Sequence, residues 1–467
     1  MISETEDKAL IKRVAKLVKQ NQDLAELYEN LLKEFEKVQA DNERMKQMLA
    51  ELSDSQKARL KGLEDRPETL KFKMVTVLFA ELHGLRKATE GMNSQALMDE
   101  MDTIYFEFDR IVKKYRIEKI KTIGDTYMCA GGIPMKNITN PVDVVMAALE
   151  MMLYISNLQK DRYEKIWELR VGIHTGPVTA STTGQKKISY DIKGDTVNTA
   201  SRLESFGEFG RITMSVMTYE LVKEFFNCEY FGKLPVKYKN DLELYSVKGL
   251  MPEFADDAEG HIPNHSFDVK FKLIQFTDLQ EIILDKLEKE LPKNLYYHNV
   301  KHTVDVVTEV ELIGWAEGVS DEEIVLLKTA GLFHDAGHTI SYKDHEDRGC
   351  EIAREFLPKY NYSQSQIDRI CEIIMATKLP PKPKNLLEEI ICDSDLDYLG
   401  RIDFIPVSNT LYQELSDRNM IGTLTEWNKL QVKFISLHNY FTNTARTLRE
   451  VNKQKQIERI SALITPD

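Results

Sequence analysis

The sequence predicts a multidomain chain with an N-terminal parallel coiled coil, an α+β domain and an all-α domain. Residues 10 to 52 repeat apolar side chains at alternating steps of four and three. Residues after Pro67 mix β-rich runs with helix-length stretches, and from about residue 268 the apolar spacing is helical almost to the end. We therefore expect a coiled coil at 8–62, an α+β domain at 70–252 and an all-α domain at 268–467.

The heptad seam is the first of these elements. With Leu10 at position d, the a positions are Val14, Asn21, Tyr28, Phe35, Asn42 and Leu49. Buried asparagines at a positions pair across the axis and fix the register of a dimer, so we expect a parallel homodimer. The alternative is one amphipathic helix packed on its own chain, which an unbroken 3.5-residue period disfavours.

Composition limits the classes of function. The chain has 42% apolar and 29% charged residues, as ordinary globular proteins do, and a net charge of −13 argues against broad binding to nucleic acid. Five widely spaced cysteines without a CxxC pair predict neither a disulfide framework nor a structural zinc site. The N-terminus is polar, and no apolar run approaches the roughly 18 residues of a membrane span. We expect a cytoplasmic protein.

Two acidic residues in the α+β region lie where strands should end or turn. Glu81 follows the apolar run VLFAEL (77–82), and Asp125 follows a glycine in KTIGD (121–125). Carboxylate oxygens suit magnesium, and an inward carboxylate is costly unless it is paired or binds a metal. Each residue taken alone is more simply explained as a solvated carboxylate.

The segment YDIKGDTVNTASR (190–202) adds a second polar group. Asp191 precedes a glycine turn, and Asn198 and Arg202 stand four residues apart on one face of a predicted helix. An amide and a guanidinium together suit a ribose oxygen and phosphate charge. The sequence contains no GxxxxGK[ST] loop and no GxGxxG motif, which disfavours a P-loop or Rossmann site.

These motifs, together with VGIHTGPV (171–178), resemble in order and spacing the catalytic domain of class III nucleotidyl cyclases over residues 70 to 250. The resemblance implies a ferredoxin-like βαββαβ fold that is active as a dimer, with each of two shared sites built from both subunits. It also implies that Glu81 and Asp125 bind two metals, magnesium or manganese.

The resemblance extends to nucleotide recognition. Lys121 and Asp191 match the pair that reads the purine, and lysine with aspartate resembles adenylyl rather than guanylyl cyclases. Adenine offers a ring-nitrogen acceptor to the lysine and an amino donor to the aspartate. Asn198 and Arg202 match the ribose-orienting and transition-state residues, and Lys237 in VKYKNDLELYSV (236–247) matches the triphosphate-binding lysine.

The implied reaction is attack of the ATP 3′-hydroxyl on the α-phosphorus, giving 3′,5′-cyclic AMP and pyrophosphate. One departure is Glu81, because the family normally has the shorter aspartate there. A misplaced carboxylate costs a two-metal site much of its rate. The alternative is a weak or inactive domain that senses nucleotide.

Histidines at metal spacing mark the last region. His298 and His302 in YYHNVKHTVDVV share a helical face, and GLFHDAGH supplies His334 and Asp335. Any single histidine is more simply a hydrogen-bonded core residue. Five of the ten histidines within about fifty residues favour a metal site, and CDSDLDYLG (392–400) adds Asp393, Asp395 and Asp397.

This order of residues resembles the HD-domain metal-dependent phosphohydrolases over residues 270 to 467. The resemblance implies that His302, His334, Asp335 and Asp395 bind zinc, manganese or iron, with Asp393 as the alternative to Asp395. YYHNVKH also resembles the YHNxxH signature of cyclic nucleotide phosphodiesterases, which implies that His298 protonates the leaving oxygen. His345 would stabilise the site or bind a second metal.

The combination predicts a cytosolic signalling enzyme, an adenylate cyclase with a C-terminal phosphohydrolase or phosphodiesterase. Making and destroying one messenger on one chain is wasteful, so either one unit regulates the other or the HD substrate is a different nucleotide. The second hypothesis is an inactive cyclase domain that senses nucleotide and regulates the HD domain. The third, a non-enzymatic scaffold, is disfavoured by the many polar site residues.

Overall fold

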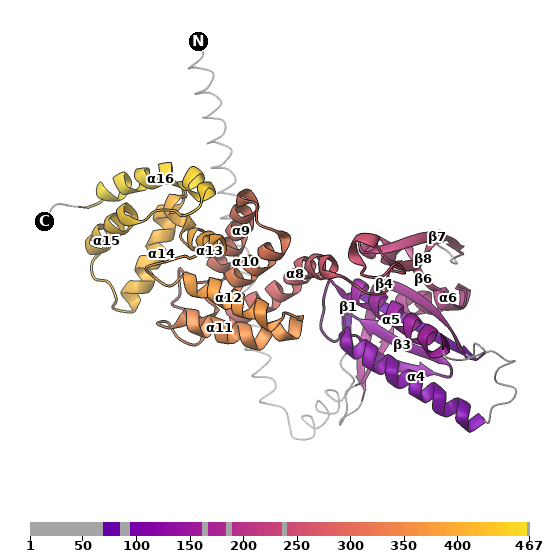
Figure 1. Cartoon of the computed structure of the whole chain (residues 1–467). Coiled ribbons are helices and arrows are strands. Elements are labelled where there is room, and N and C mark those ends of the chain that lie inside the picture. Colours follow the sequence, from indigo (N-terminus) through magenta and orange to yellow (C-terminus); the bar gives the residue numbers. More distant parts are fainter. Residues whose placement is uncertain (1–68, 85–93, 161–166, 184–188, 236–240, 465–467) are drawn as a thin grey trace, which may run out of the picture. The chain divides into compact units, whose positions relative to one another are not determined.

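The computed structural model describes residues 69–84, 94–160, 167–183, 189–235 and 241–464. The predicted coiled coil at 8–62 and the predicted phosphate-binding Lys237 lie outside these residues. The described chain consists of a mixed sheet with flanking helices, followed by an all-helical region (Figure 1).

The first part of the described chain forms one sheet. Its strand order is β2-β3-β1-β4-β6-β8-β7, and β5 pairs with β4 at the side. β1 and β2 each pair antiparallel with β3, β4 pairs parallel with β6, and β8 pairs antiparallel with both β6 and β7. The strands are β1 (Thr69–Gly84), β2 (Glu118–Ile123), β3 (Thr126–Gly131), β4 (Trp167–Thr183), β5 (Ser189–Lys193), β6 (Ile212–Ser215), β7 (Phe226–Leu234) and β8 (Leu242–Leu250).

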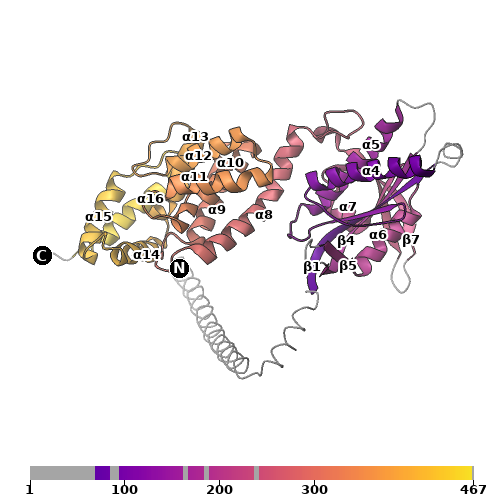
Figure 2. The same ribbon diagram turned by 90° about the horizontal axis from the view of Figure 1, so that it is seen from below.

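Four helices accompany these strands: α4 (Ser94–Lys114), α5 (Asn140–Lys160), α6 (Asp195–Phe206) and α7 (Val216–Val222). The order β1-α4-β2-β3-α5-β4, with β1 and β3 between β2 and β4, is the βαββαβ arrangement that the sequence predicts. Figure 2 shows α4 and α5 on one side of the sheet and α6 on the other.

The central strand β1 is buried on both faces, as its continuous apolar run predicts. Leu78 and Ala80 belong to one buried cluster, and Val77 and Phe79 belong to another. Because side chains alternate along a strand, Glu81 follows the face of Val77 and Phe79. This is the face that contacts Ala200 of α6.

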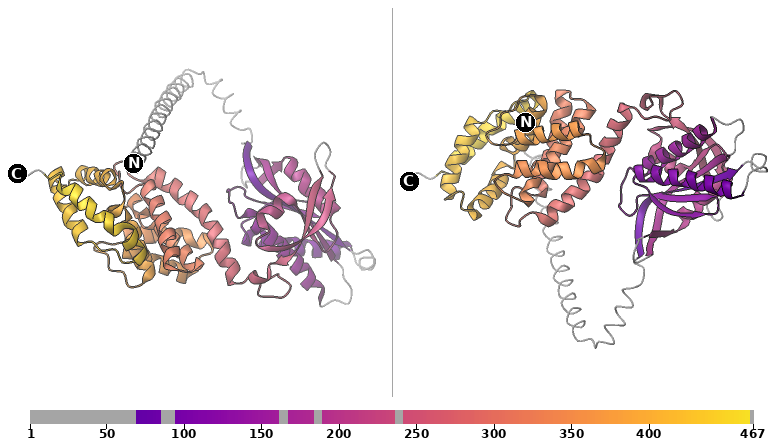
Figure 3. Two further views of the ribbon diagram at one scale, coloured as in Figure 1. Left: turned by 90° about the horizontal axis from the view of Figure 1, so that it is seen from above. Right: turned by 60° about the horizontal axis from the view of Figure 1, so that its bottom comes forward.

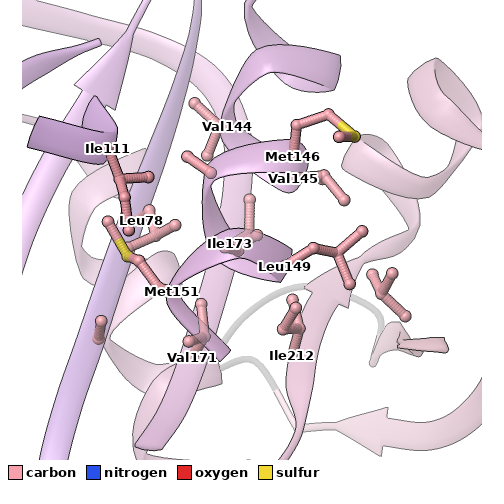
Figure 4. Packing of buried hydrophobic residues seen from close by; sticks show 14 of the residues in the cluster. Leu78, Ile111, Val144, Val145, Met146, Leu149, Met151, Val171, Ile173 and Ile212 are labelled. Carbon is pink, nitrogen blue, oxygen red and sulfur yellow. The ribbon is translucent and has the colours of Figure 1, made fainter. Parts of the chain in front are cut away.

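Helix α5 contributes nine buried residues to the core on the opposite face. Figure 4 shows Val145 and Leu149 of α5 packed near Val171 and Ile173 of β4. The window Asn140–Leu158 is long and apolar enough to cross a membrane by length and composition, although 61% of it is buried inside the domain. The expectation that no such run exists is therefore wrong for α5, which passes the criterion as a buried core helix.

The remainder of the described chain is helical, as expected. Figure 3 shows this region from two directions, with helices packed around one another and no strand among them. Its main core comprises buried side chains between Phe276 and Ala445. The α-helices are α8 (His265–Glu290), α9 (Val300–Glu317), α10 (Asp321–Phe333), α11 (His345–Phe356), α12 (Gln364–Ala376), α13 (Leu386–Asp395), α14 (Phe404–Asp417), α15 (Leu424–Leu437) and α16 (Asn443–Ser461).

Candidate functional sites

The sheet brings Glu81 and Asp125 to neighbouring positions. Glu81 of β1 lies opposite Thr126 of β3 in the strand register, and the Leu82 N–H donates to the Asp125 carbonyl over 2.9 Å. Gly124 has φ +62°, which glycine adopts without steric cost, and it turns the chain between β2 and β3. The two predicted metal ligands therefore belong to one end of one strand pair.

Glu81 has a partner that the sequence interpretation missed. Arg170 of β4 donates through Nη2 to the Glu81 carboxylate and through Nε to Glu204 Oε1, the latter over 2.7 Å. Burial alone would raise the pKa of Glu81, but its hydrogen bonds with Glu204 and Arg170 outweigh burial and lower it. Burial also raises the pKa of Glu204, to about 7. The sequence signal for Arg170 was the alternation along ELRVGIH. Because Val171 and Ile173 are buried on one face of β4, Arg170 has to lie on the opposite face.

The predicted purine-reading pair is in contact. Lys121 Nζ of β2 donates to Asp191 Oδ1 of β5 over 2.9 Å, although the two residues are 70 positions apart. Both side chains are partly exposed, at 45% and 33%, so a ligand has access to them. The hydrogen bond from Lys121 is the main cause that lowers the pKa of Asp191.

Helix α6 carries two further predicted nucleotide-binding residues. It begins after Gly194, whose φ of +141° favours glycine. Asn198 and Arg202 are one helical turn apart, and Arg202 Nη2 donates to the Pro235 carbonyl over 2.5 Å. Pro235 is the last described residue before the segment that contains Lys237.

Three helices of the all-α region bring the predicted HD ligands together. His302 of α9, His334 at the end of α10 and Asp395 of α13 present ligand atoms within 4.8 Å of one another. His302 Nε2 lies 3.1 Å from Asp395 Oδ1 and 3.4 Å from Asp335 Oδ2, and His334 Nε2 lies 3.3 Å from Asp335 Oδ2. These residues come from segments up to 93 positions apart in the sequence.

The donors in this cluster fit a divalent transition metal. The His334 Nδ1–H donates to the Gly331 carbonyl over 2.8 Å, which directs Nε2 towards Asp335 and Asp395. Burial alone would raise the pKa of Asp395, but hydrogen bonds from His302 and His334 outweigh it and lower the pKa. Without a cation these groups share protons, and a bound metal would replace those protons as the compensating charge.

A second group of possible ligands adjoins the first. His298, Asp335 and His338 also present ligand atoms within 4.8 Å of one another. His338 is 3% exposed, and neither ring nitrogen has a hydrogen-bond partner in the part of the chain that the structure describes. His345 stacks on His338 with ring centroids 4.0 Å apart, and its Nε2 is 3.6 Å from Asp335 Oδ1. Buried ring nitrogens that make no hydrogen bond are suited to binding a metal ion.

Of the three neighbouring aspartates, only Asp395 belongs to this cluster. Asp393 is fully buried and accepts hydrogen bonds from the Phe441 and Thr442 backbone N–H groups and the Thr442 hydroxyl. Asp397 pairs with Arg449. The geometry therefore favours Asp395 over its alternative Asp393 as the ligand.

The predicted proton donor His298 is held by a residue that the sequence interpretation missed. His298 Nδ1 is 2.5 Å from Glu414 Oε1, and Glu414 also accepts the His298 and Tyr297 backbone N–H groups and the Tyr342 hydroxyl. The Glu414 carboxylate is fully buried, and although burial would raise its pKa, the His298 side chain and the backbone N–H groups of Tyr297 and His298 lower it to about 2. Glu414 lies 116 residues beyond His298, and nothing in its local sequence marks it.

A cavity of 360 Å³ opens beside His298. Its walls are largely aromatic and aliphatic, with Tyr398, Trp427 and Phe434 among them, and Gln431 supplies an amide. Gln431 also accepts the Ser408 hydroxyl, which fixes the amide. The cavity therefore suits a flat ring that carries polar edges, placed next to the metal ligands.

The fold and these two clusters define the class of protein. Residues 68–249 match the family model of the adenylate and guanylate cyclase catalytic domain, and residues 299–399 match that of the HD domain. The chain therefore carries a class III nucleotidyl cyclase catalytic domain followed by an HD domain.

Individual relatives include cyclases for both purines. The chain is 32% identical over 213 residues to an adenylate cyclase of Mycobacterium tuberculosis, covering 45% of this chain and 48% of the relative. It is 33% identical over 191 residues to guanylate cyclase 32E of Drosophila melanogaster, covering 40% and 16%. The crystal structure of the adenylyl cyclase CyaB from P. aeruginosa is 30% identical, covers 40% of this chain and 100% of that chain, and superposes with a TM-score of 0.37.

The matched region spans less than half of each of these two curated relatives. The comparisons therefore establish a nucleotide cyclase domain, and they do not decide between ATP and GTP.

Proposed function

We propose that the protein converts ATP to 3′,5′-cyclic AMP and pyrophosphate in its cyclase domain and hydrolyses a nucleotide phosphoester in its HD domain. The observation that carries the choice of ATP is the contact between Lys121 and Asp191. When a nucleobase separates this pair, Lys121 offers a donor to the ring nitrogen of adenine and Asp191 offers an acceptor to its amino group. Guanine presents the opposite pattern at that edge.

The cyclisation needs an oriented hydroxyl and a neutralised triphosphate. Asn198 orients the ribose, Arg202 neutralises charge that develops on the phosphate, and Lys237 binds the triphosphate. Glu81 and Asp125 would hold magnesium or manganese, which would lower the cost of the alkoxide and of the leaving charge. We place two such sites between two copies of the chain, joined by the N-terminal coiled coil and the cyclase domains.

Exchange of the purine-reading pair tests the choice of ATP. Lys121→Glu combined with Asp191→Cys should lower kcat/KM for ATP by roughly 100-fold. The adenine ring nitrogen then faces a carboxylate instead of a donor, and the adenine amino group loses its carboxylate acceptor. The matched control is Lys119→Glu in the same strand, whose ammonium pairs with Asp109 at 2.7 Å. Unchanged ATP kinetics in the double variant would remove these two residues from purine recognition.

In the HD domain, His302, His334, Asp335 and Asp395 would hold zinc, manganese or iron. Such a metal would supply hydroxide near neutral pH and positive charge for the phosphate. His298 lines the cavity together with the proposed ligand Asp395, so it can protonate the leaving oxygen while the cavity receives the base. The substrate class is thus a nucleotide phosphoester, either the cyclase product or another nucleotide.

Metal content tests this assignment directly. We expect His302→Ala and Asp335→Ala to lose bound transition metal, measured by elemental analysis of the purified full-length protein. The matched control is His265→Ala, because His265 is an exposed histidine of the same region that contacts only Glu322 among the interactions described for it. Unaltered metal content in both ligand variants would show that the HD cluster is misassigned.

A second candidate function has one observation in its favour. Glu81 is paired with Arg170, so a cyclase domain without bound metal has a stable ion pair at its metal position. In this alternative the domain binds nucleotide, makes no cyclic product and regulates the HD domain. ATP would then change the rate of HD hydrolysis while no cyclic AMP forms in magnesium or manganese.

A further inference from the structure

Arg170 places a fixed positive charge at the proposed metal site of the cyclase domain. It bridges Glu81 of β1 and Glu204 of α6, and the side chains of Arg170 and Glu81 are each only 18% exposed. The Glu204 side chain is 6% exposed, and Arg170 also donates to the Ser205 carbonyl over 3.3 Å. The guanidinium is therefore held in place from the α6 side whether or not Glu81 contacts it.

The length of the Glu81 side chain explains this contact. Glutamate reaches one methylene further than the aspartate that the resemblance leads one to expect at this position. Because β1 and β4 are neighbours in the sheet, the longer carboxylate reaches across to Arg170. The same carboxylate then faces two cations, the guanidinium and the divalent metal, and binding of either weakens its attraction for the other.

Glu204 makes an exchange between these two cations possible. If a divalent metal draws the Glu81 carboxylate away, Arg170 still has Glu204 Oε1 at 2.7 Å and is not left as an unpaired buried charge. We propose that Arg170 and Glu204 are positioning residues that set the metal affinity of the cyclase site: Arg170 occupies Glu81 when no metal is bound and is held by Glu204 when metal binds. The inference rests on the proposed role of Glu81 and Asp125 as metal ligands.

The proposal predicts opposite effects for the two residues. Glu204→Gln removes one of the two carboxylates that pair with Arg170, so Arg170 pairs with Glu81 alone. Metal binding should then weaken by about 10-fold or more, the range seen when an outer partner of a metal ligand is lost. Arg170→Gln removes the competing cation and should tighten metal binding. Arg170→Lys keeps the charge and should stay close to the unmodified protein.

The test is a titration of the full-length protein with Mn²⁺ alone, in which electron paramagnetic resonance measures the free ion. Each protein is compared with the same protein carrying Asp125→Asn, so the difference between the two isotherms reports the cyclase site rather than the HD site. The matched control is Glu208→Gln, because Glu208 lies just beyond α6, is 62% exposed and pairs with Arg211. Circular dichroism checks that each variant is folded.

Tighter binding in Arg170→Gln together with weaker binding in Glu204→Gln supports the proposal, because a purely structural ion pair would shift both variants in the same direction. Shifts of one sign, or no shift in either folded variant, overturn it while leaving the metal assignment intact. If Asp125→Asn itself leaves the titration unchanged, the metal assignment of the proposed function fails, and the inference fails with it.

Discussion

Single carboxylates hold basic side chains at the proposed sites of both domains. Asp191 holds Lys121, Glu204 holds Arg170, and Glu414 holds His298, each through a hydrogen bond or ion pair between distant parts of the sequence. Glu414 is the most deeply buried of them, with no exposed side-chain surface. A buried carboxylate that accepts four donors fixes the imidazole it contacts far better than solvent would.

The Glu414 contact leads to a prediction about proton donation. Glu414→Gln should lower kcat for a 3′,5′-cyclic nucleotide by about 100-fold, the size of a general-acid contribution, because His298 loses the carboxylate that keeps it oriented and protonated. Metal bound by His302, His334 and Asp395 should be retained, since neither Glu414 nor the His298 that it contacts belongs to that group of candidate ligands.

The control substrate is a p-nitrophenyl phosphodiester, whose leaving group needs little protonation. We expect its hydrolysis by Glu414→Gln to fall much less than that of the cyclic nucleotide. An equal loss on both substrates, or none on either, would contradict the positioning role of Glu414.

How far the residues were predictable depends on how local their signal is. His302, His334, Asp335 and Asp395 carry recognisable spacing, and the structure brings them within a few ångströms of one another. Arg170, Glu204 and Glu414 carry no distinctive local motif. The fold brings Arg170 against Glu204, and separately brings Glu414 against His298. Lys237 and the coiled coil lie outside the described residues, so those predictions remain untested.

At the scale of elements, the close approach of α6 to β4 positions the proposed nucleotide-binding residues of α6. Gly172 of β4 lies directly under α6, and a Cβ there would be 2.1 Å from the Glu204 backbone nitrogen and 2.5 Å from its Cα. Neither contact can be relieved by a side-chain rotation, because both atoms are backbone. The glycine therefore sets how near Asn198 and Arg202 come to the sheet.

Gly172→Ala should therefore destabilise the cyclase domain by about 1–3 kcal/mol, the usual cost of overpacking, and lower cyclase activity by displacing α6. Differential scanning calorimetry of the full-length protein measures the first effect. The control is Gly331→Ala in α10, where the nearest atoms to a new Cβ are at 3.5 Å, an ordinary contact distance. A Gly172→Ala variant with unchanged melting and full activity would contradict this account of α6.

The elements themselves were predictable to different degrees. The apolar run of β1 indicates a strand buried on both faces. The helical spacing of apolar residues after residue 268 indicates helices that pack through one face. The sheet order and the contact between α6 and β4 depend on which strands become neighbours, and a local period carries no such information. The apolar character of α5 reflects its place in the core rather than a membrane.

At the scale of the whole molecule, the chain joins a nucleotidyl cyclase catalytic domain, for which we propose formation of a cyclic phosphodiester, to an HD domain whose cluster suits phosphoester hydrolysis. Both candidate sites contain carboxylate or histidine groups of the kinds that bind divalent cations. The central claim is that the first of these domains works on ATP despite the glutamate at position 81.

The most direct test is to incubate the full-length protein with α-labelled ATP, in magnesium and separately in manganese, and to separate the products chromatographically over time. The His302→Ala variant is run in parallel so that hydrolysis by the HD domain does not hide the product, and Asp125→Ala serves as the inactive reference. We predict that cyclic AMP forms in the unmodified protein and in His302→Ala, whether or not it later gives way to AMP, and that none forms in Asp125→Ala. No cyclic AMP from folded His302→Ala in either metal, or undiminished cyclic AMP from Asp125→Ala, would contradict the claim.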